Sequence, residues 1–133
     1  AMGEALDVND KLKDLDLSWN SIRLQGAVEI GKSLIENATL TKLNLASNSF
    51  RKVGGASVGL ALKFNKGLVY LNMSDNGLTK ESAVVFASGL EKNEILIDLI
   101  LDGNSLGDSG GRYHIMLNYY YFYSIVVTII YYY

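Results

Sequence analysis

Cysteine is absent from the sequence, which excludes a disulfide framework and a cysteine-ligated zinc site. A chain without cysteine fits a reducing compartment. The first residues, Ala1-Met2-Gly3-Glu4, also lack the basic n-region and the apolar h-region of a signal peptide. We therefore expect a cytoplasmic protein.

A strong excess of charge of either sign is lacking as well. The net charge is −2, from 12 basic and 14 acidic residues. Proteins that bind nucleic acid or an anionic membrane surface through charge carry a clear basic excess. The composition therefore predicts neither nucleic acid nor a membrane surface as a partner.

What the sequence does contain is a repeat. Residues 40–50 read L-x-x-L-x-L-x-x-N-x-Φ, where Φ is a large apolar residue, and the same frame begins at residues 12, 40, 68 and 96, with a constant step between starts. A period of roughly 20–29 residues that carries this pattern is the signature of a leucine-rich repeat. We number each unit from its first leucine as position 1. The sequence predicts an α/β solenoid, a horseshoe arc with parallel strands on the concave face and α-helices on the convex face.

Each unit divides into a strand and a helix. Leu43 and Leu45 alternate with polar residues, which is the period of two of a strand with one buried face. The helix is expected to start near residues 26, 54 and 82, and its apolar residues recur at helical spacing. A small residue within each apolar stripe (Gly31, Gly59 and Ala87) predicts a close approach of the helix to the sheet. Because no unit buries its apolar face alone, neighbouring units share one core.

The period divides the chain into segments. Residues 1–11 match the end of a preceding repeat helix, because Leu6 and Asn9 map onto Leu34 and Asn37. The repeats span 12–39, 40–67, 68–95 and 96–123, the last with an irregular helix, and 124–133 form a terminal apolar strand or tail. We expect a piece of a longer array; the alternative is a natural N-terminal cap in the same register.

Position 9 of every unit is an asparagine. A chain that turns sharply after a strand leaves main-chain N–H and C=O groups without partners, and an unsatisfied buried group costs about 1–3 kcal/mol. A buried side-chain amide satisfies such groups. The column Asn20, Asn48, Asn76 and Asn104 therefore predicts an asparagine ladder that runs through the stacked units.

The C-terminal end departs from the pattern. No charged residue follows Arg112, and eight of the nine tyrosines lie at 113–133. One more repeat step places Val127 and Ile129 at inward strand positions, which predicts a fifth parallel strand of β-branched residues. An apolar edge strand invites pairing with a second chain, so we predict homodimerisation through Ile125, Val126, Thr128 and Ile130. The alternatives are a membrane span over 114–133, which we do not favour because basic flanks are missing, and a variant terminus.

One short segment matches the sequence of a known catalytic motif. Residues 107–111 read G-D-S-G-G, as around the nucleophile of chymotrypsin-like serine proteases. That chemistry needs a histidine to take the serine proton and a buried aspartate to orient it, and the single histidine, His114, lies on a predicted helix. Gly110 occupies the repeat position of Gly26 and Gly54, so the repeat explains the motif better. We expect no enzyme, no metal site and no cofactor.

Recognition is expected on the concave face, where positions 3, 5, 7 and 8 of each unit project. Trp19 and Tyr70 are the residues expected to anchor an interface; the alternative for Trp19 is that it covers the edge of a missing upstream repeat. A slight acidic excess favours a folded protein or a basic peptide as ligand, and the alternative is a face with no ligand. The candidate contact residues are Asp14, Asp16, Trp19, Lys42, Asn44, Tyr70, Asn72, Asp75, Asp98 and Ile100.

From Leu12 to about Arg112 the chain resembles ribonuclease-inhibitor-like leucine-rich repeats. The phrases at residues 15–20 and 61–68 are similar to those of animal intracellular proteins, among them orphan leucine-rich-repeat-containing proteins and the sensor domains of NOD-like receptors. The chain is unlike ribonuclease inhibitor itself, which is cysteine-rich with alternating repeat lengths. The resemblance implies a non-enzymatic protein–protein interaction module. The alternatives are a regulator of a small GTPase of the Ran-activator type, a ligand-sensing fragment of an innate immune receptor, or a fragmentary array without activity.

Overall fold

The computed structural model describes residues 2–106 and, as backbone, residues 126–128. Several expectations lie outside the described residues. These are the G-D-S-G-G motif, His114, the irregular helix of the fourth repeat, the membrane-span alternative, and the self-association residues Ile125 and Ile130.

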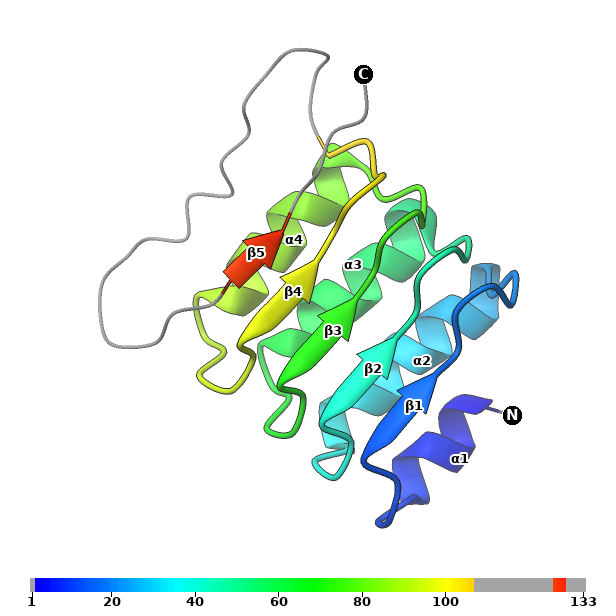
Figure 1. The fold of residues 1–133 in the computed structure, drawn as a ribbon, viewed down its shortest axis with the longest axis vertical. Coiled ribbons are helices and arrows are strands. Elements are labelled where there is room, and N and C mark those ends of the chain that lie inside the picture. Colours follow the sequence, from blue (N-terminus) through cyan, green and yellow to red (C-terminus); the bar gives the residue numbers. More distant parts are fainter. Residues whose placement is uncertain (1, 107–125, 129–133) are drawn as a thin grey trace.

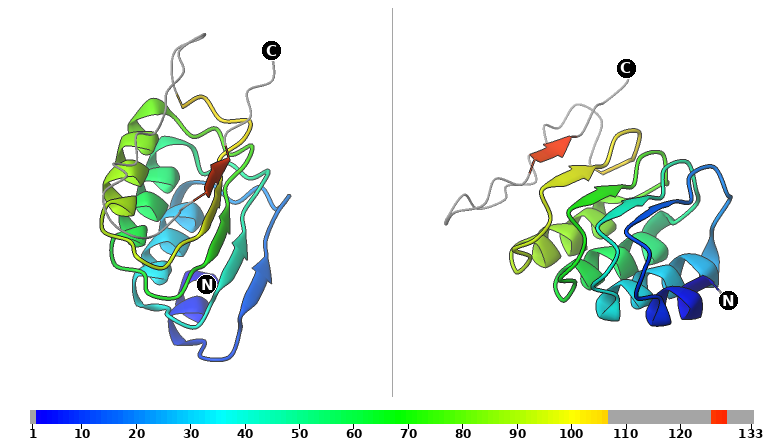
Figure 2. Two further views of the ribbon diagram at one scale, coloured as in Figure 1. Left: turned by 60° about the vertical axis from the view of Figure 1, so that its left-hand side comes forward. Right: turned by 60° about the horizontal axis from the view of Figure 1, so that its bottom comes forward.

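Helices and strands alternate along the chain from α1 to β4. The five strands form one parallel sheet in chain order, β1-β2-β3-β4-β5, and α1 to α4 lie in a second layer behind it (Figures 1 and 2). The fold is an α/β leucine-rich-repeat solenoid with strands on its concave face and helices on its convex face. The elements are α1 (Met2–Val8), β1 (Asp14–Asp16), α2 (Leu24–Glu36), β2 (Lys42–Asn44), α3 (Arg51–Leu62), β3 (Tyr70–Asn72), α4 (Lys80–Leu90), β4 (Asp98–Ile100) and β5 (Val126–Thr128).

The register of the sheet follows the period of the repeat. Leu15, Leu43, Leu71 and Leu99 pair side by side across β1 to β4, and Val127 of β5 pairs with Leu99. Parallel strands need a crossover, and α2, α3 and α4 supply it between successive strands from β1 to β4. The position-4 leucines therefore form one continuous row.

One core runs behind the sheet through all described units. The leucines of β2, β3 and β4 are completely buried, as are Leu45, Met73 and Leu101 at position 6. Leu15 is only partly buried, because β1 is an edge strand of the described sheet. The stacking of neighbours thus decides how deeply a residue is buried, even when its position in the unit is the same.

The small residues of the helices have a different role from the expected one. A β-carbon on Gly59 would lie 2.8 Å from the main-chain nitrogen of Phe86 in α4, and one on Gly31 would collide with Ser57 of α3. These glycines therefore allow each helix to approach the next helix. The expectation of close contact with the sheet was wrong, because the neighbouring helix is what lies against this side of the stripe.

Among the residues that the structure describes, no helix is both long enough and apolar enough to cross a membrane.

Candidate functional site

The concave face carries an ordered row of side chains at position 3. Because the strands pair in register, Asp14, Lys42, Tyr70 and Asp98 lie side by side. Lys42 Nζ lies 3.4 Å from Asp14 Oδ2 and 5.6 Å from the centroid of the Tyr70 ring. The single lysine of the row is thus held between a carboxylate and an aromatic ring.

The position-5 row shapes the turn after each strand. Asp16 Oδ1 accepts hydrogen bonds from the main-chain N–H (2.8 Å) and the hydroxyl (2.6 Å) of Ser18. Asn72 Oδ1 accepts the same pair of bonds from Ser74 (2.9 and 2.6 Å), and Asn44 Oδ1 accepts a bond from the N–H of residue 46. The fourth member, Ile100, lacks a polar atom to do this. Three of the predicted contact residues therefore also hold the local backbone.

The carboxylate of Asp16 accepts hydrogen bonds from both Ser18 and Asn44. The hydroxyl of Ser18 lowers the pKa of Asp16 most, followed by the main-chain N–H of Ser18, the side-chain amide of Asn44 at 3.0 Å, and the charge of Lys42. All of these favour the ionised form. A negative charge at this place is therefore a stable property of the surface at neutral pH.

The residue at position 8, which follows the strand, has a left-handed backbone conformation in each described unit. Trp19, Ser47, Asp75 and Gly103 have φ values of 60°, 55°, 52° and 67°. Residues with large side chains seldom adopt this left-handed conformation, which glycine and asparagine adopt more readily. Trp19 is nevertheless 83% exposed. It does not line the pocket at the open end of the core, so the structure gives no support to the alternative that it covers that edge.

The described part of the concave face is acidic. One lysine, Lys42, stands against five aspartates at positions 3, 5, 7 and 8. These aspartates are Asp14, Asp16, Asp75, Asp98 and Asp102. A surface of this sign attracts a basic partner and repels an acidic one.

The position-9 asparagines make the bonds of a ladder. Asn48 Nδ2 donates to the carbonyls of Leu17 and Leu45, both at 2.9 Å, and its Oδ1 accepts from the N–H groups of Asn20 (3.1 Å) and Ile22 (2.8 Å). Asn104 repeats this arrangement two units further on. Asn48, Asn76 and Asn104 are buried, whereas Asn20 is exposed at the end of the array.

Sequence reasoning missed a second ladder at the ends of the helices. Asn65 Nδ2 donates to the carbonyls of Leu34 (2.6 Å) and Asn37 (3.0 Å), and its Oδ1 accepts from the N–H of Leu68 (2.8 Å). Asn37 and Asn93 make equivalent bonds. The signal was present, because Asn9, Asn37, Asn65 and Asn93 also recur at the repeat period. Both ladders are structural and lie behind the concave face.

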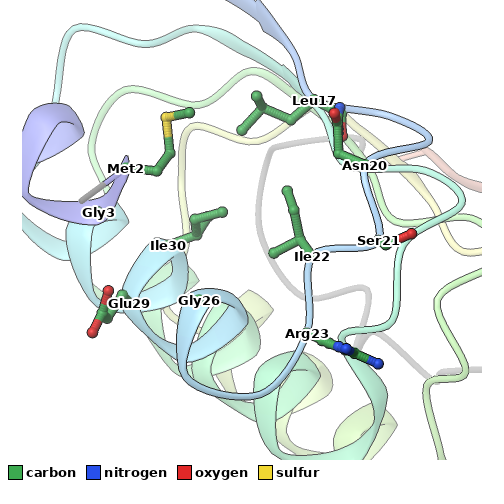
Figure 3. Close-up of a pocket in the computed structure, with 10 residues that line it drawn as sticks. All are labelled: Met2, Gly3, Leu17, Asn20, Ser21, Ile22, Arg23, Gly26, Glu29 and Ile30. Carbon is green, nitrogen blue, oxygen red and sulfur yellow. Dashed lines mark hydrogen bonds between the residues drawn. The ribbon is translucent and has the colours of Figure 1, made fainter.

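A pocket of about 370 Å³ opens at the N-terminal end of the solenoid, and none of the predicted contact residues lines it (Figure 3). It was not predicted from the sequence. Its lining is formed by Met2, Gly3, Leu17, Asn20, Ser21, Ile22, Arg23, Gly26, Glu29 and Ile30.

Within the described residues, no group of three or more histidine, cysteine, aspartate or glutamate side chains could hold a metal ion. The geometry is that of a contact surface, built from rows of short polar side chains with two aromatic residues.

Comparison with known proteins agrees with this architecture. The family model described as "Leucine Rich repeat" matches residues 8–31, 36–59 and 64–87, together more than half of the chain. No curated protein matches the sequence. The solved structure named "Leiomodin-1 Actin-Binding Site 2 (ABS2)" is similar in fold, with a TM-score of 0.72 at 19% identity, and the match covers 83% of this chain and 64% of that one. The chain thus spans less than two thirds of that structure. It belongs to the leucine-rich repeat family.

Proposed function

We propose that this chain is a non-enzymatic protein–protein interaction module that binds its partner on the concave sheet face. Leucine-rich repeats stack into solenoids whose concave surface is an extended binding surface. The observation that carries the proposal is Trp19, which is 83% exposed in a left-handed conformation.

Trp19 is unfavourable in the isolated chain for two reasons. Its backbone occupies a region that costs an ordinary L-residue about 1–2 kcal/mol, and its large apolar side chain faces water. Gly103 occupies the same position of another unit without that backbone cost. Because Ser47 and Asp75 share the left-handed turn, the unusual feature of Trp19 is its large exposed side chain. Tryptophan is enriched among the residues that dominate binding energy. Burial against a partner would offset the cost.

The charge of the face selects the class of partner. Five aspartates and one lysine favour a basic peptide or a basic patch on a folded protein. The hydrogen bonds of Asp16 lower its pKa further and so favour its negative charge. Tyr70 and Lys42 add an aromatic ring and a positive charge to the same face. Association with such a partner should weaken as salt screens these charges.

We also propose a subclass, a location and a first partner to test. Full α-helices on the convex side and a constant repeat period support placement in the ribonuclease-inhibitor-like subclass, and the lack of cysteine supports a cytoplasmic location. Actin is one folded protein to test as a partner, because the similar solved structure is named for an actin-binding site. A GTPase-regulating role and an innate-immune sensing role remain the alternatives within this subclass.

The test compares variants in capture experiments from a cell extract, with monomeric actin as a separate probe. Trp19→Gly removes the side chain and suits the left-handed backbone, so the fold is retained. Val84→Ala is the matched control, since Val84 is a 63% exposed apolar residue on the convex face. We expect Trp19→Gly to weaken binding about tenfold or more and Val84→Ala to leave it unchanged. Equal capture by both variants and the unmodified chain would remove the concave-face proposal.

A further inference from the structure

The second repeat, residues 40–67, differs from its neighbours in charge. No aspartate or glutamate lies between Glu36 and Asp75, although the chain as a whole has a net charge of −2. Four of the basic residues of this repeat lie in α3 or directly after it. They are Arg51 and Lys52 at the start of α3, and Lys63 and Lys66 beyond its end. The helix therefore has positive charge at both ends and no acidic residue of its own.

The outward side of α3 is apolar between these basic ends. Val53, Leu60 and Phe64 recur at helical spacing and are 67%, 50% and 47% exposed. Val58 and Leu62, on the other side of the helix, are completely buried in the core. Because α3 packs between α2 and α4 in the convex layer (Figure 2), its three exposed apolar residues form a second stripe that faces away from the sheet.

The neighbouring helices provide an internal comparison, because one repeat step in either direction gives the positions equivalent to this stripe. All six equivalent residues are polar and exposed. They are Gln25, Lys32 and Glu36 in the second repeat helix, α2, and Glu81, Ser88 and Lys92 in or after α4. The repeat fold therefore does not require apolar residues at these positions. An exposed apolar stripe that is bordered by charge is typical of an interaction surface.

Two lysines lie close to the stripe. Lys63 Nζ lies 5.3 Å from the centroid of the Phe64 ring, which places a positive charge beside the apolar surface. Lys52 Nζ lies 3.8 Å from Glu81 Oε1 of α4, and both of these side chains are 62% exposed. An exposed ion pair of this kind contributes little to stability. Both lysines are therefore able to pair with a carboxylate of a partner.

The length and the charge of α3 define the occupant. At a rise of about 1.5 Å per residue, the distance from Arg51 to Lys63 is about 18 Å, or roughly three helical turns. A flat anionic membrane would also meet the exposed Glu36 and Glu81 of the flanking helices, which disfavours it. A single helix laid along α3 meets the basic side chains at both ends and the apolar stripe between them. Carboxylates in its first and last turns would complement this charge.

We propose that this convex surface, formed by Val53, Leu60 and Phe64 with Lys52 and Lys63, binds an acidic amphipathic helix of a partner protein that lies along α3. The apolar side of the partner helix packs on the stripe, and its carboxylates pair with the lysines at the two ends. The acidic concave face repels a partner of this charge. The proposal is therefore independent of the function proposed above.

The probe is a synthetic, fluorescein-labelled peptide of roughly four helical turns, held helical by a lactam bridge, with leucines along one side and glutamates in its first and last turns. Its counterpart has lysines in place of the glutamates. Fluorescence anisotropy measures the Kd of each peptide for the unmodified chain and for its variants, and circular dichroism confirms that each variant is folded.

The variants come in matched pairs. Leu60→Ser introduces the residue that α4 has at the equivalent position, and Val84→Ser, at an exposed valine of α4, is its control. Lys63→Glu reverses a charge beside the stripe. Lys11→Glu makes the same change in net charge at an exposed lysine before β1, away from α3.

We expect the acidic peptide to bind the unmodified chain about tenfold more tightly than the basic peptide, or better. Leu60→Ser should weaken this binding about tenfold, and Lys63→Glu should weaken it more at low salt than at high salt. The two controls, and Trp19→Gly on the concave face, should leave it unchanged.

Equal affinities for the two peptides, or equal effects of Leu60→Ser and Val84→Ser, would overturn the proposal. Binding of phosphatidylserine vesicles but not of the acidic peptide, if Leu60→Ser abolished it, would also overturn it, because the surface would then bind lipid. So would a dimer of the unmodified chain, seen by light scattering, that Leu60→Ser abolishes, because a second copy would then be the occupant.

Discussion

Individual polar side chains hold the units and the turns of this molecule in place through hydrogen bonds. Asn48 joins two units through its side-chain amide, which donates and accepts at the same time. Asp16 and Asn72 hold the turns after their strands while facing the concave surface. The recurrence of asparagine at position 9 predicted a ladder, but its bonding pattern depends on which carbonyls the neighbouring unit brings within reach.

Asn48→Ala should destabilise the chain by about 1–3 kcal/mol, because it leaves buried main-chain groups of two units without partners. Asn20→Ala is the matched control and should cost less, since Asn20 is exposed and bonds within its own turn. The free energies of unfolding from urea titrations give the comparison. Equal losses for both variants would contradict the ladder as a stabilising element.

Ser18→Ala should raise the pKa of Asp16 towards its ordinary value, because the Ser18 hydroxyl is the largest cause of its lowering. A carboxylate with a lowered pKa contributes stability above its unfolded pKa of about 3.9, and the contribution is lost as the pH falls through the folded pKa. Titration of the carboxyl carbons by NMR measures the shift. The pKa of Glu81, which is lowered by Thr79 on another turn, should stay unchanged and serves as the control.

At the scale of elements, strands and helices follow from local periodicity. The alternation at Leu43 and Leu45 predicted β2, and the helical stripes predicted α2 to α4. The helices begin two to three residues before the expected starts, at Leu24, Arg51 and Lys80. The contacts of the small helical residues could not be predicted in the same way, since a stripe identifies the buried side of a helix but not the element that covers it.

Two glycine substitutions test the effects of helix packing and of helix propensity on stability separately. Gly59→Ala should destabilise the chain by about 1–3 kcal/mol, because its β-carbon would lie 2.8 Å from the main-chain nitrogen of Phe86. Gly26→Ala should stabilise it by up to about 1 kcal/mol, because its β-carbon meets only a methyl of Ile22 at 3.9 Å and alanine favours a helix. Thermal melts of both variants measure the effects. A stabilising Gly59→Ala would contradict the close packing of α3 and α4.

For the whole molecule, stability comes from units that cover one another. Leu71 lies between two neighbouring strands and is fully buried, whereas Leu15 occupies the same position in the edge strand and is partly exposed. Both belong to one row of the sheet. The array therefore has a protected middle and a less protected N-terminal end.

Leu71→Ala should cost about 2–5 kcal/mol through lost burial and the remaining cavity, and Leu15→Ala distinctly less. Hydrogen exchange provides a second measurement, in which amides near β1 should exchange faster than those near β3. Equal costs for the two variants would indicate that burial in this array does not depend on neighbouring units.

The sequence by itself determined the repeat, the alternation of strand and helix, and the register, because a constant period returns each leucine to the same place beside the last. It also identified the residues of the concave rows, which are set by strand alternation. Only the tertiary structure decided which atoms meet across that period, such as Lys42 between Asp14 and Tyr70, and Gly59 against α4. These contacts join residues on different units, so they depend on how the units stack in space and not on the pattern within any one of them.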